Sequence, residues 1–203
     1  MNQPPVRRTQ VYLLMLLFFG PLLGAGLLYF VFPQWQPQSR TNYGELINPA
    51  RPAPDDLRLQ TADGKQVGVE ALRQRWTYLY VGGESCEQAC QDKLYQSRQI
   101  RIRLNDKRSR VQRVYLAPDA AALPALKQQL QAIHPDLLIY APVTPESGLK
   151  AFLHAAGTAA GTAQAIYLFD PHANWLMVYP ADADSAGILA DTKKLLAISQ
   201  IDG

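Results

Sequence analysis

Residues 76–90, which read WTYLYVGGESCEQAC, decide the fold of this chain. Residues 76–81 are aromatic and β-branched, a composition that favours a β-strand, and Gly82 and Gly83 end that strand. Cys86 and Cys90 follow, and the sequence from Cys86 to about residue 104 has helix-forming composition. The stretch therefore predicts a strand, a loop and a helix, with the two cysteines in the loop and the first turn of the helix.

The segments on either side alternate between strand and helix patterns. A short hairpin is expected around the turn at Asp63-Gly64, followed by a helical turn at 70–74. The other expected elements are strands at 111–116 and 137–140, helices at 120–133 and 146–155, a hairpin of 165–170 with 175–179, and a final helix at 185–198. This rhythm predicts an α/β fold in which helices flank a central sheet.

The N-terminal part has the composition of a membrane anchor. Residues 11–32 contain no charged side chain, and a helix of that length spans a bilayer. A cleaved signal peptide is the competing interpretation, but the apolar run is longer than signal peptides usually have. Arg7 and Arg8 precede the run, so the positive-inside rule predicts a cytoplasmic N-terminus at 1–10 and a transmembrane helix at 11–33.

The rest of the chain is then expected outside the cytoplasmic face. Residues 34–55 include Pro37, Pro49, Pro52 and Pro54 and show no apolar periodicity, which predicts an extended tether. The folded domain is expected at 56–203. In a Gram-negative bacterium this arrangement describes a single-pass protein of the inner membrane, with its domain in the oxidising periplasm.

Composition excludes several classes of protein. Hydrophobic residues make up 48% of the chain and charged residues 18%, which argues against disorder and low-complexity polymers. The chain has 20 basic and 17 acidic residues, and without Arg7 and Arg8 it is nearly neutral, so nucleic acid is not expected as a partner. Two cysteines are too few for a disulfide-stapled scaffold.

The candidate chemistry lies at Cys86 and Cys90. A helix N-terminus favours a thiolate, the form that attacks disulfides or binds soft metals. If both residues are helical, a spacing of four puts their Cα atoms about 6 Å apart, which also permits a disulfide. An inert buried pair or a permanent disulfide stays open as an alternative.

The stretch 76–90 resembles the strand, loop and CxxxC element of the Sco (SenC) family of membrane-anchored proteins. The turn at Asp63-Gly64-Lys65, the strand at 111–116 and the sequence 166–171 follow in the same order, so the resemblance covers residues 57–198. It implies a thioredoxin-like fold and a role in cytochrome c oxidase assembly. It also implies copper binding through Cys86, Cys90 and a later histidine, with oxidase subunits or other copper-site assembly factors as partners.

The histidine of the family pattern has no counterpart here. Family members carry it shortly before the strand that corresponds to 166–170, where this chain reads GTAAGTAQA at 157–165, with Thr162 near the expected place. Two soft thiolates can hold Cu(I), but without an imidazole stable Cu(II) binding is not expected. The other candidates have simpler expected roles: His134 as a helix cap, His154 on a helix surface, His172 in a turn and Met177 in the core.

Two alternatives to copper handling stay open. A client-specific thiol-disulfide oxidoreductase would use Cys86, nearer the loop, as the attacking thiol, although Glu84 and Glu87 oppose thiolate formation. A non-catalytic assembly scaffold would use a basic cluster against lipid or an acidic partner: Arg98, Arg101, Arg103, Lys107, Arg108, Arg110 and Arg113. The preferred interpretation is a Sco-like accessory protein that handles Cu(I) or thiol redox chemistry, without conventional enzyme turnover.

Overall fold

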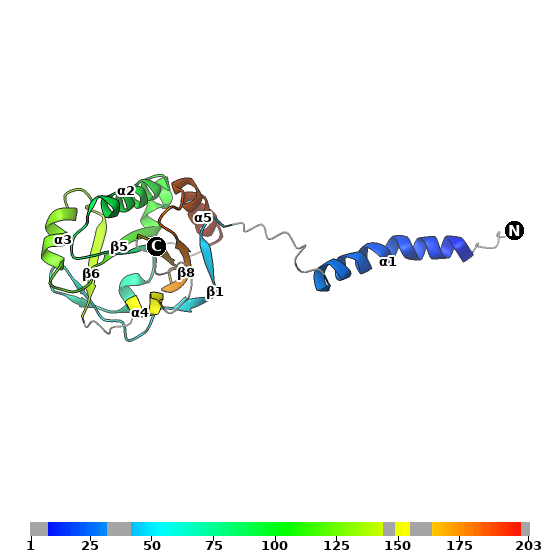
Figure 1. Ribbon diagram of the computed structural model, residues 1–203, viewed down its shortest axis with the longest axis horizontal. Coiled ribbons are helices and arrows are strands. Elements are labelled where there is room, and N and C mark those ends of the chain that lie inside the picture. Colours follow the sequence, from blue (N-terminus) through cyan, green and yellow to red (C-terminus); the bar gives the residue numbers. More distant parts are fainter. Residues whose placement is uncertain (1–7, 32–41, 144–148, 155–163, 200–203) are drawn as a thin grey trace. The chain divides into compact units, whose positions relative to one another are not determined.

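A computed structural model describes residues 8–31, 42–143, 149–154 and 164–199, in two units (Figure 1). The first unit contains helix α1 (Arg8–Phe30), and the second is a folded domain that begins at Asn42. By length and composition, α1 could cross a membrane, and residues 10–27 form its apolar stretch. This matches the helix expected from the sequence.

Within the described residues, the domain is built on one eight-stranded sheet with the order β1-β8-β7-β4-β5-β6-β2-β3. The pairs β4–β5 and β5–β6 are parallel, and the other neighbouring strands are antiparallel. The strands are β1 (Glu45–Pro52), β2 (Leu59–Thr61), β3 (Gln66–Val67), β4 (Trp76–Val81), β5 (Val111–Leu116), β6 (Leu137–Pro142), β7 (Ile166–Phe169) and β8 (Asn174–Tyr179).

Helices cover both faces of this sheet (Figure 1). They are α2 (Gln88–Ile102), α3 (Leu123–Leu130), α4 (Leu149–His154) and α5 (Ser185–Ile198), with short 3-10 helices η2 (Val69–Leu72) and η3 (Asn105–Arg110). One core lies beneath α4 and η2, and two others lie beneath α2, α3 and α5. Strands β4 and β5 are buried at nearly every position, which is the pattern of strands covered on both faces.

Most elements lie where the sequence predicts them. The strands at 76–81 and 111–116 and the helix at 185–198 agree with the prediction at both ends. Helix α3 is shorter than the helix expected at 120–133 and includes only Leu123–Leu130. Of the helix expected at 146–155, α4 covers Leu149–His154, and the expected residues on either side lie outside the described part of the chain.

The beginning of the domain differs from the expected boundary at residue 56. Residues 45–52, expected to belong to the tether, form β1 at one edge of the sheet and pair with β8. An edge strand tolerates proline because one row of its N–H groups has no partner strand. The register also shifts between Leu46 and Arg51, where Pro49 lies, so the ladder avoids a residue that cannot donate.

Asp191 on α5 fastens the start of the domain to its core. One oxygen of its carboxylate accepts hydrogen bonds from the backbone N–H groups of Tyr43 and Gly44, both at 2.9 Å, and from the Tyr179 hydroxyl at 3.4 Å. Asp191 is only 4% exposed. Tyr43 and Gly44 come just before the first residue of β1, so their N–H groups are not part of its pairing with β8. The Asp191 carboxylate accepts from these N–H groups instead.

We expect Asp191→Ala to lower the free energy of unfolding by about 2 kcal/mol, because it leaves buried donors without an acceptor. Urea unfolding of the full-length protein in detergent, followed by the fluorescence of the buried Trp175, measures the change. Asp184→Ala is the matched control, since Asp184 is exposed and makes no side-chain cap hydrogen bond to α5. Equal stability losses in the two variants would contradict this role for Asp191.

Candidate functional site

The two cysteines lie where β4 passes into α2. Strand β4 ends at Val81 and α2 begins at Gln88, after Glu87 with an extended backbone. Cys86 is therefore in the loop and Cys90 in the first turn of the helix, as the sequence predicts. The helix begins two residues after Cys86.

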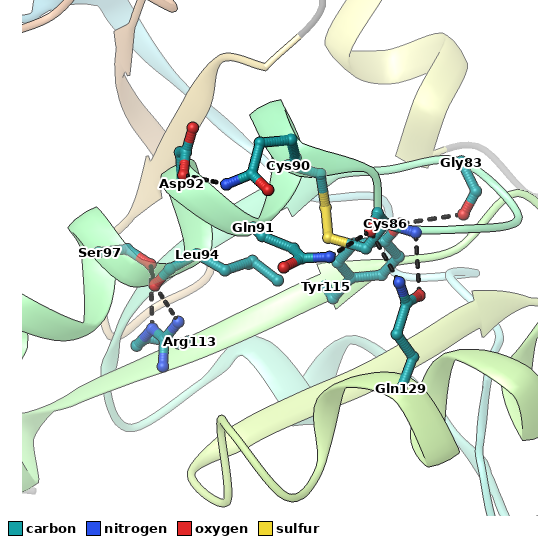
Figure 2. Close-up of a disulfide and its surroundings, with 11 residues drawn as sticks. Gly83, Cys86, Cys90, Gln91, Asp92, Leu94, Ser97, Arg113, Tyr115 and Gln129 are labelled. Carbon is teal, nitrogen blue, oxygen red and sulfur yellow. Dashed lines mark hydrogen bonds between the residues drawn. A yellow bond between two sulfur atoms is a disulfide. The ribbon is translucent and has the colours of Figure 1, made fainter.

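A disulfide joins Cys86 to Cys90 (Figure 2). Their Cα atoms are 5.2 Å apart, within the range that a disulfide requires and close to the separation expected from the sequence. The bond links the loop to the helix. Reduction would present two thiols at this separation.

Both cysteines are buried in the oxidised form. Cys86 is 1% exposed and Cys90 is 8% exposed, and both belong to the apolar cluster beneath α2 and α3. The oxidoreductase alternative names Cys86 as the attacking thiol because it lies nearer the loop, but the structure shows Cys86 as the more buried of the two cysteines. A partner that attacks Cys86 therefore requires movement of the loop, whereas Cys90 keeps a small exposed surface.

Two glutamines hold the backbone of Cys86. Gln129 on α3 accepts from the Cys86 N–H at 3.1 Å and donates through Nε2 to the Cys86 carbonyl at 2.8 Å. Gln91 on α2 donates to the same carbonyl at 3.1 Å (Figure 2). Sequence analysis did not find Gln129, since 43 residues separate it from Cys86 and no local pattern relates them.

Tyr115 on β5 supports the loop from the sheet side. Its hydroxyl donates to the Gly83 carbonyl at 2.9 Å, and a Cβ atom at Gly82 would collide with its ring. The position of Gly82 therefore requires glycine because of this close approach. Burial and the neighbouring Tyr80 raise the pKa of Tyr115 to about 12, so the hydroxyl stays a neutral donor at physiological pH.

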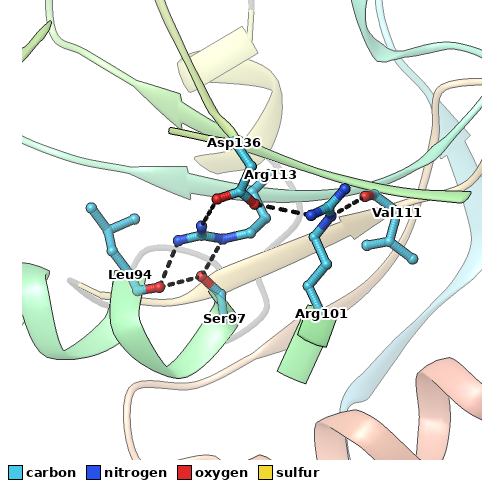
Figure 3. Close-up of polar contacts among 6 residues, drawn as sticks. All are labelled: Leu94, Ser97, Arg101, Val111, Arg113 and Asp136. Carbon is cyan, nitrogen blue, oxygen red and sulfur yellow. Dashed lines mark hydrogen bonds and ion pairs between the residues drawn. The ribbon is translucent and has the colours of Figure 1, made fainter. Parts of the chain in front are cut away.

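An ionic network centred on the buried Arg113 lies between α2 and the sheet (Figure 3). Arg113 on β5 is 1% exposed and donates to Ser97 Oγ at 3.0 Å, to the Leu94 carbonyl at 2.6 Å and to Asp136 at 3.0 Å. Arg101 reaches the other oxygen of Asp136 at 3.3 Å. Burial lowers the pKa of Arg113, and the Asp136 carboxylate opposes that effect. The network fixes α2, and with it Cys90, on the sheet.

This network changes the interpretation of the basic cluster. Arg101 and Arg113 act inside the domain, and Arg110 donates to the carbonyls of Leu196 and Ser199 at the end of α5. Three of the seven residues expected to form a basic surface thus have structural partners. Their long side chains reach carbonyl and carboxylate groups of other elements, which the sequence alone does not reveal.

The described histidines do not approach the cysteines. The residues after His134 lead into β6, whose first residue pairs with Arg113, and His172 lies in the turn that joins β7 to β8. Phe169 at that turn pairs with Thr77 near the start of β4, whereas the cysteines follow the end of β4. The side chain of His154 and the whole of Thr162 lie outside the described residues. Among the described residues, no group of three or more His, Cys, Asp or Glu could hold a metal ion.

The expected role of His134 as a cationic helix cap is wrong. Its side chain is buried, its Nδ1 atom has no hydrogen-bond partner within the described structure, and α3 ends four residues earlier. Burial, Arg113 and Arg98 lower the pKa of His134, so the neutral ring is favoured. His172 is exposed in its turn and Met177 is in the core, both as expected.

The lowered pKa of His134 predicts a loss of stability in acid. The unfolded ring has a pKa of about 6.5, so the stabilisation is complete above that pH and decreases as the pH falls toward the lower folded value. We expect His134→Gln to lose less stability than wild type between pH 7.5 and 5. Urea midpoints across this range measure the effect, with His172→Gln as the exposed control. An unchanged pH profile for His134→Gln would contradict the prediction.

A known protein family matches the C-terminal part of the chain. Residues 76–199, more than half of the sequence, match the family described as transmembrane-like, thioredoxin-like, C-terminal domain. The chain belongs to this family. The thioredoxin-like fold expected from the sequence is thereby confirmed. No curated protein sequence matches the chain.

Solved structures of Sco proteins resemble this thioredoxin-like protein in fold. Yeast Sco1 with copper bound has a TM-score of 0.60 and 18% identity, and the match covers 74% of this chain and 95% of Sco1. Arabidopsis thaliana ScoI with copper bound has a TM-score of 0.56 and 20% identity, covering 70% and 97%. BsSco, described with a disulfide switch as a member of the Sco family of cytochrome c oxidase assembly proteins, has a TM-score of 0.56 and 15% identity, covering 76% and 99%. These matches show that the domain has the same fold as Sco proteins.

Proposed function

We propose that this protein is a membrane-anchored, Sco-like accessory factor of respiratory cytochrome c oxidase assembly, which handles Cu(I) through Cys86 and Cys90. The observation that carries the proposal is a pair of cysteines 5.2 Å apart at the loop and first turn of a domain with the Sco fold. Helix α1 would hold the protein in the bacterial inner membrane, with the N-terminus in the cytoplasm and the domain in the periplasm. Oxidase subunits or other copper-site assembly factors would be its partners.

The donor set fits Cu(I) as a cargo. Reduction of the disulfide supplies two thiolates from neighbouring residues, and soft sulfur ligands suit Cu(I). No described histidine lies with them to complete a three-ligand site, so the proposal is limited to Cu(I) held by two sulfurs. Disulfide formation would consume both ligands, so the redox state of the pair would control whether copper can bind.

Client-specific thiol-disulfide exchange is the second candidate, favoured by the observed disulfide. In that reaction two client thiols become a disulfide, while the Cys86–Cys90 bond breaks and each of its sulfurs takes up a proton. Two electrons move from the client to this protein. Cys86 is buried and Cys90 keeps only a small exposed surface, so little of the disulfide is open to a client, which fits a specialised client better than a broad range of substrates.

One experiment separates these functions. The full-length protein in detergent is fully reduced and titrated with Cu(I) without oxygen, against a competing chelator, and disulfide exchange with a dithiol peptide is measured in parallel. We expect tight binding of one Cu(I) per chain. Exchange without copper binding would support the oxidoreductase, and the absence of both would favour a non-catalytic scaffold and overturn the proposal.

A further inference from the structure

The backbone of Cys86 is held by contacts that do not involve its sulfur. Gln129 pairs with both the N–H and the carbonyl of Cys86, as a residue of a neighbouring strand would, and Gln91 adds a second donor to the carbonyl. Figure 2 shows these three bonds converging on Cys86 beside the disulfide. None of them has to break when the disulfide is reduced.

The two cysteines differ in what fixes them after reduction. Cys90 lies within α2, where the helix and the buried Arg113 beneath it hold the backbone in place. Cys86 lies in the loop between Val81 and Gln88, so the bonds to its own backbone are what can keep it near Cys90. A loop residue that becomes free must lose conformational entropy each time the two sulfurs come together again.

We propose that Gln129 is a positioning residue of the Cys86–Cys90 site, which keeps the reduced Cys86 beside Cys90. This inference rests on the proposed function, because it concerns the same two sulfurs. By holding Cys86, Gln129 raises the effective concentration of one thiol toward the other. The same restraint favours the disulfide over the dithiol and favours the capture of one Cu(I) by both thiolates.

The surroundings of Gln129 allow this role to be tested without disturbing the core. Gln129 is an exposed residue, whereas Leu126 and Leu130 on the same helix are buried and pack inward. Gln129→Leu therefore removes both bonds to Cys86 without opening a cavity. Gln128 is also exposed and, among the described residues, makes no hydrogen bond to the loop, so Gln128→Leu is the matched control.

The test equilibrates the full-length protein in detergent with reduced and oxidised glutathione. When two glutathione molecules reduce the pair, the Cys86–Cys90 bond breaks, each sulfur takes up a proton, and one molecule of glutathione disulfide forms. We expect Gln129→Leu to lower the equilibrium constant for the disulfide about 10-fold, which for two electrons corresponds to about 30 mV. Gln91→Leu, which removes one bond of three, is expected to have a smaller effect in the same direction.

Affinity for Cu(I) should fall in parallel, about 10-fold in Gln129→Leu and not at all in Gln128→Leu. A purely structural role would lower the thermal midpoint and leave the redox equilibrium unchanged, and that result would overturn the inference. So would equal redox changes in the Gln129 and Gln128 variants. If the wild type neither exchanges with glutathione nor binds Cu(I), the proposed function itself fails, and the inference fails with it.

Discussion

Replacing either Cys86 or Cys90 by serine is expected to lower the Cu(I) affinity of the reduced protein by more than about 100-fold. Residues that only support a metal ligand typically change affinity 10- to 100-fold, and here one of two ligands is lost. A serine hydroxyl is a hard, protonated group that does not replace a thiolate for Cu(I). Each single variant should therefore be nearly as defective as the double variant, because one thiolate cannot chelate.

The competition between the protein and a Cu(I) chelator measures this loss. The comparison uses fully reduced wild type, so that no protein in the series contains the Cys86–Cys90 crosslink. A disulfide that closes a loop of this length would stabilise the folded state by about 2 kcal/mol, and this difference is thereby removed from the comparison. Met177→Leu controls for sulfur in general, since Met177 is a buried thioether away from the loop. Retention of tight binding in either serine variant would show that the copper ligands lie elsewhere.

The sequence predicts those parts of the fold that depend on local composition. Strand β4 is aromatic and β-branched and is ended by glycines, so its bounds follow from residues 76–83 alone. The placement of Cys86 in the loop and Cys90 in the first helical turn follows in the same way. Strand β1 could not be predicted, because it is rich in proline and exists only through pairing with β8, which lies more than 100 residues away in the chain.

The side-chain environment of the site depends on contacts between distant elements. Gln129 reaches Cys86 from α3, and nothing in the sequence near either residue indicates the contact. The burial of Cys86, the attacking thiol of the oxidoreductase alternative, also depends on packing between distant elements and could not be read from its place in a loop. Arg113 illustrates the same limit, since a charged residue among other basic residues is normally exposed. Its burial depends on acceptors from three other residues: Asp136, Ser97 and the Leu94 carbonyl.

Asp136 therefore has a large expected effect although it lies away from the cysteines. Asp136→Ala would leave the charged Arg113 guanidinium buried without its counter-ion, a change that typically costs 3–5 kcal/mol. Water can replace part of the lost interaction because the Asp136 side chain is 25% exposed. We accordingly expect a loss of about 3 kcal/mol in the free energy of unfolding, measured by urea denaturation of the full-length protein in detergent.

Two further variants decide whether burial is the cause. Asp55→Ala removes a carboxylate that is 93% exposed and pairs with Arg73 at the surface, so it should cost less than about 1 kcal/mol. Adding Arg113→Met to Asp136→Ala should recover part of the lost stability, since the unpaired buried charge is then absent. If Asp136→Ala costs no more than Asp55→Ala, the network does not hold α2 on the sheet. Helix α2 would then depend on its apolar residues and on its other hydrogen bonds, such as those of Gln96 to Ala183 and Ser185, to present Cys90.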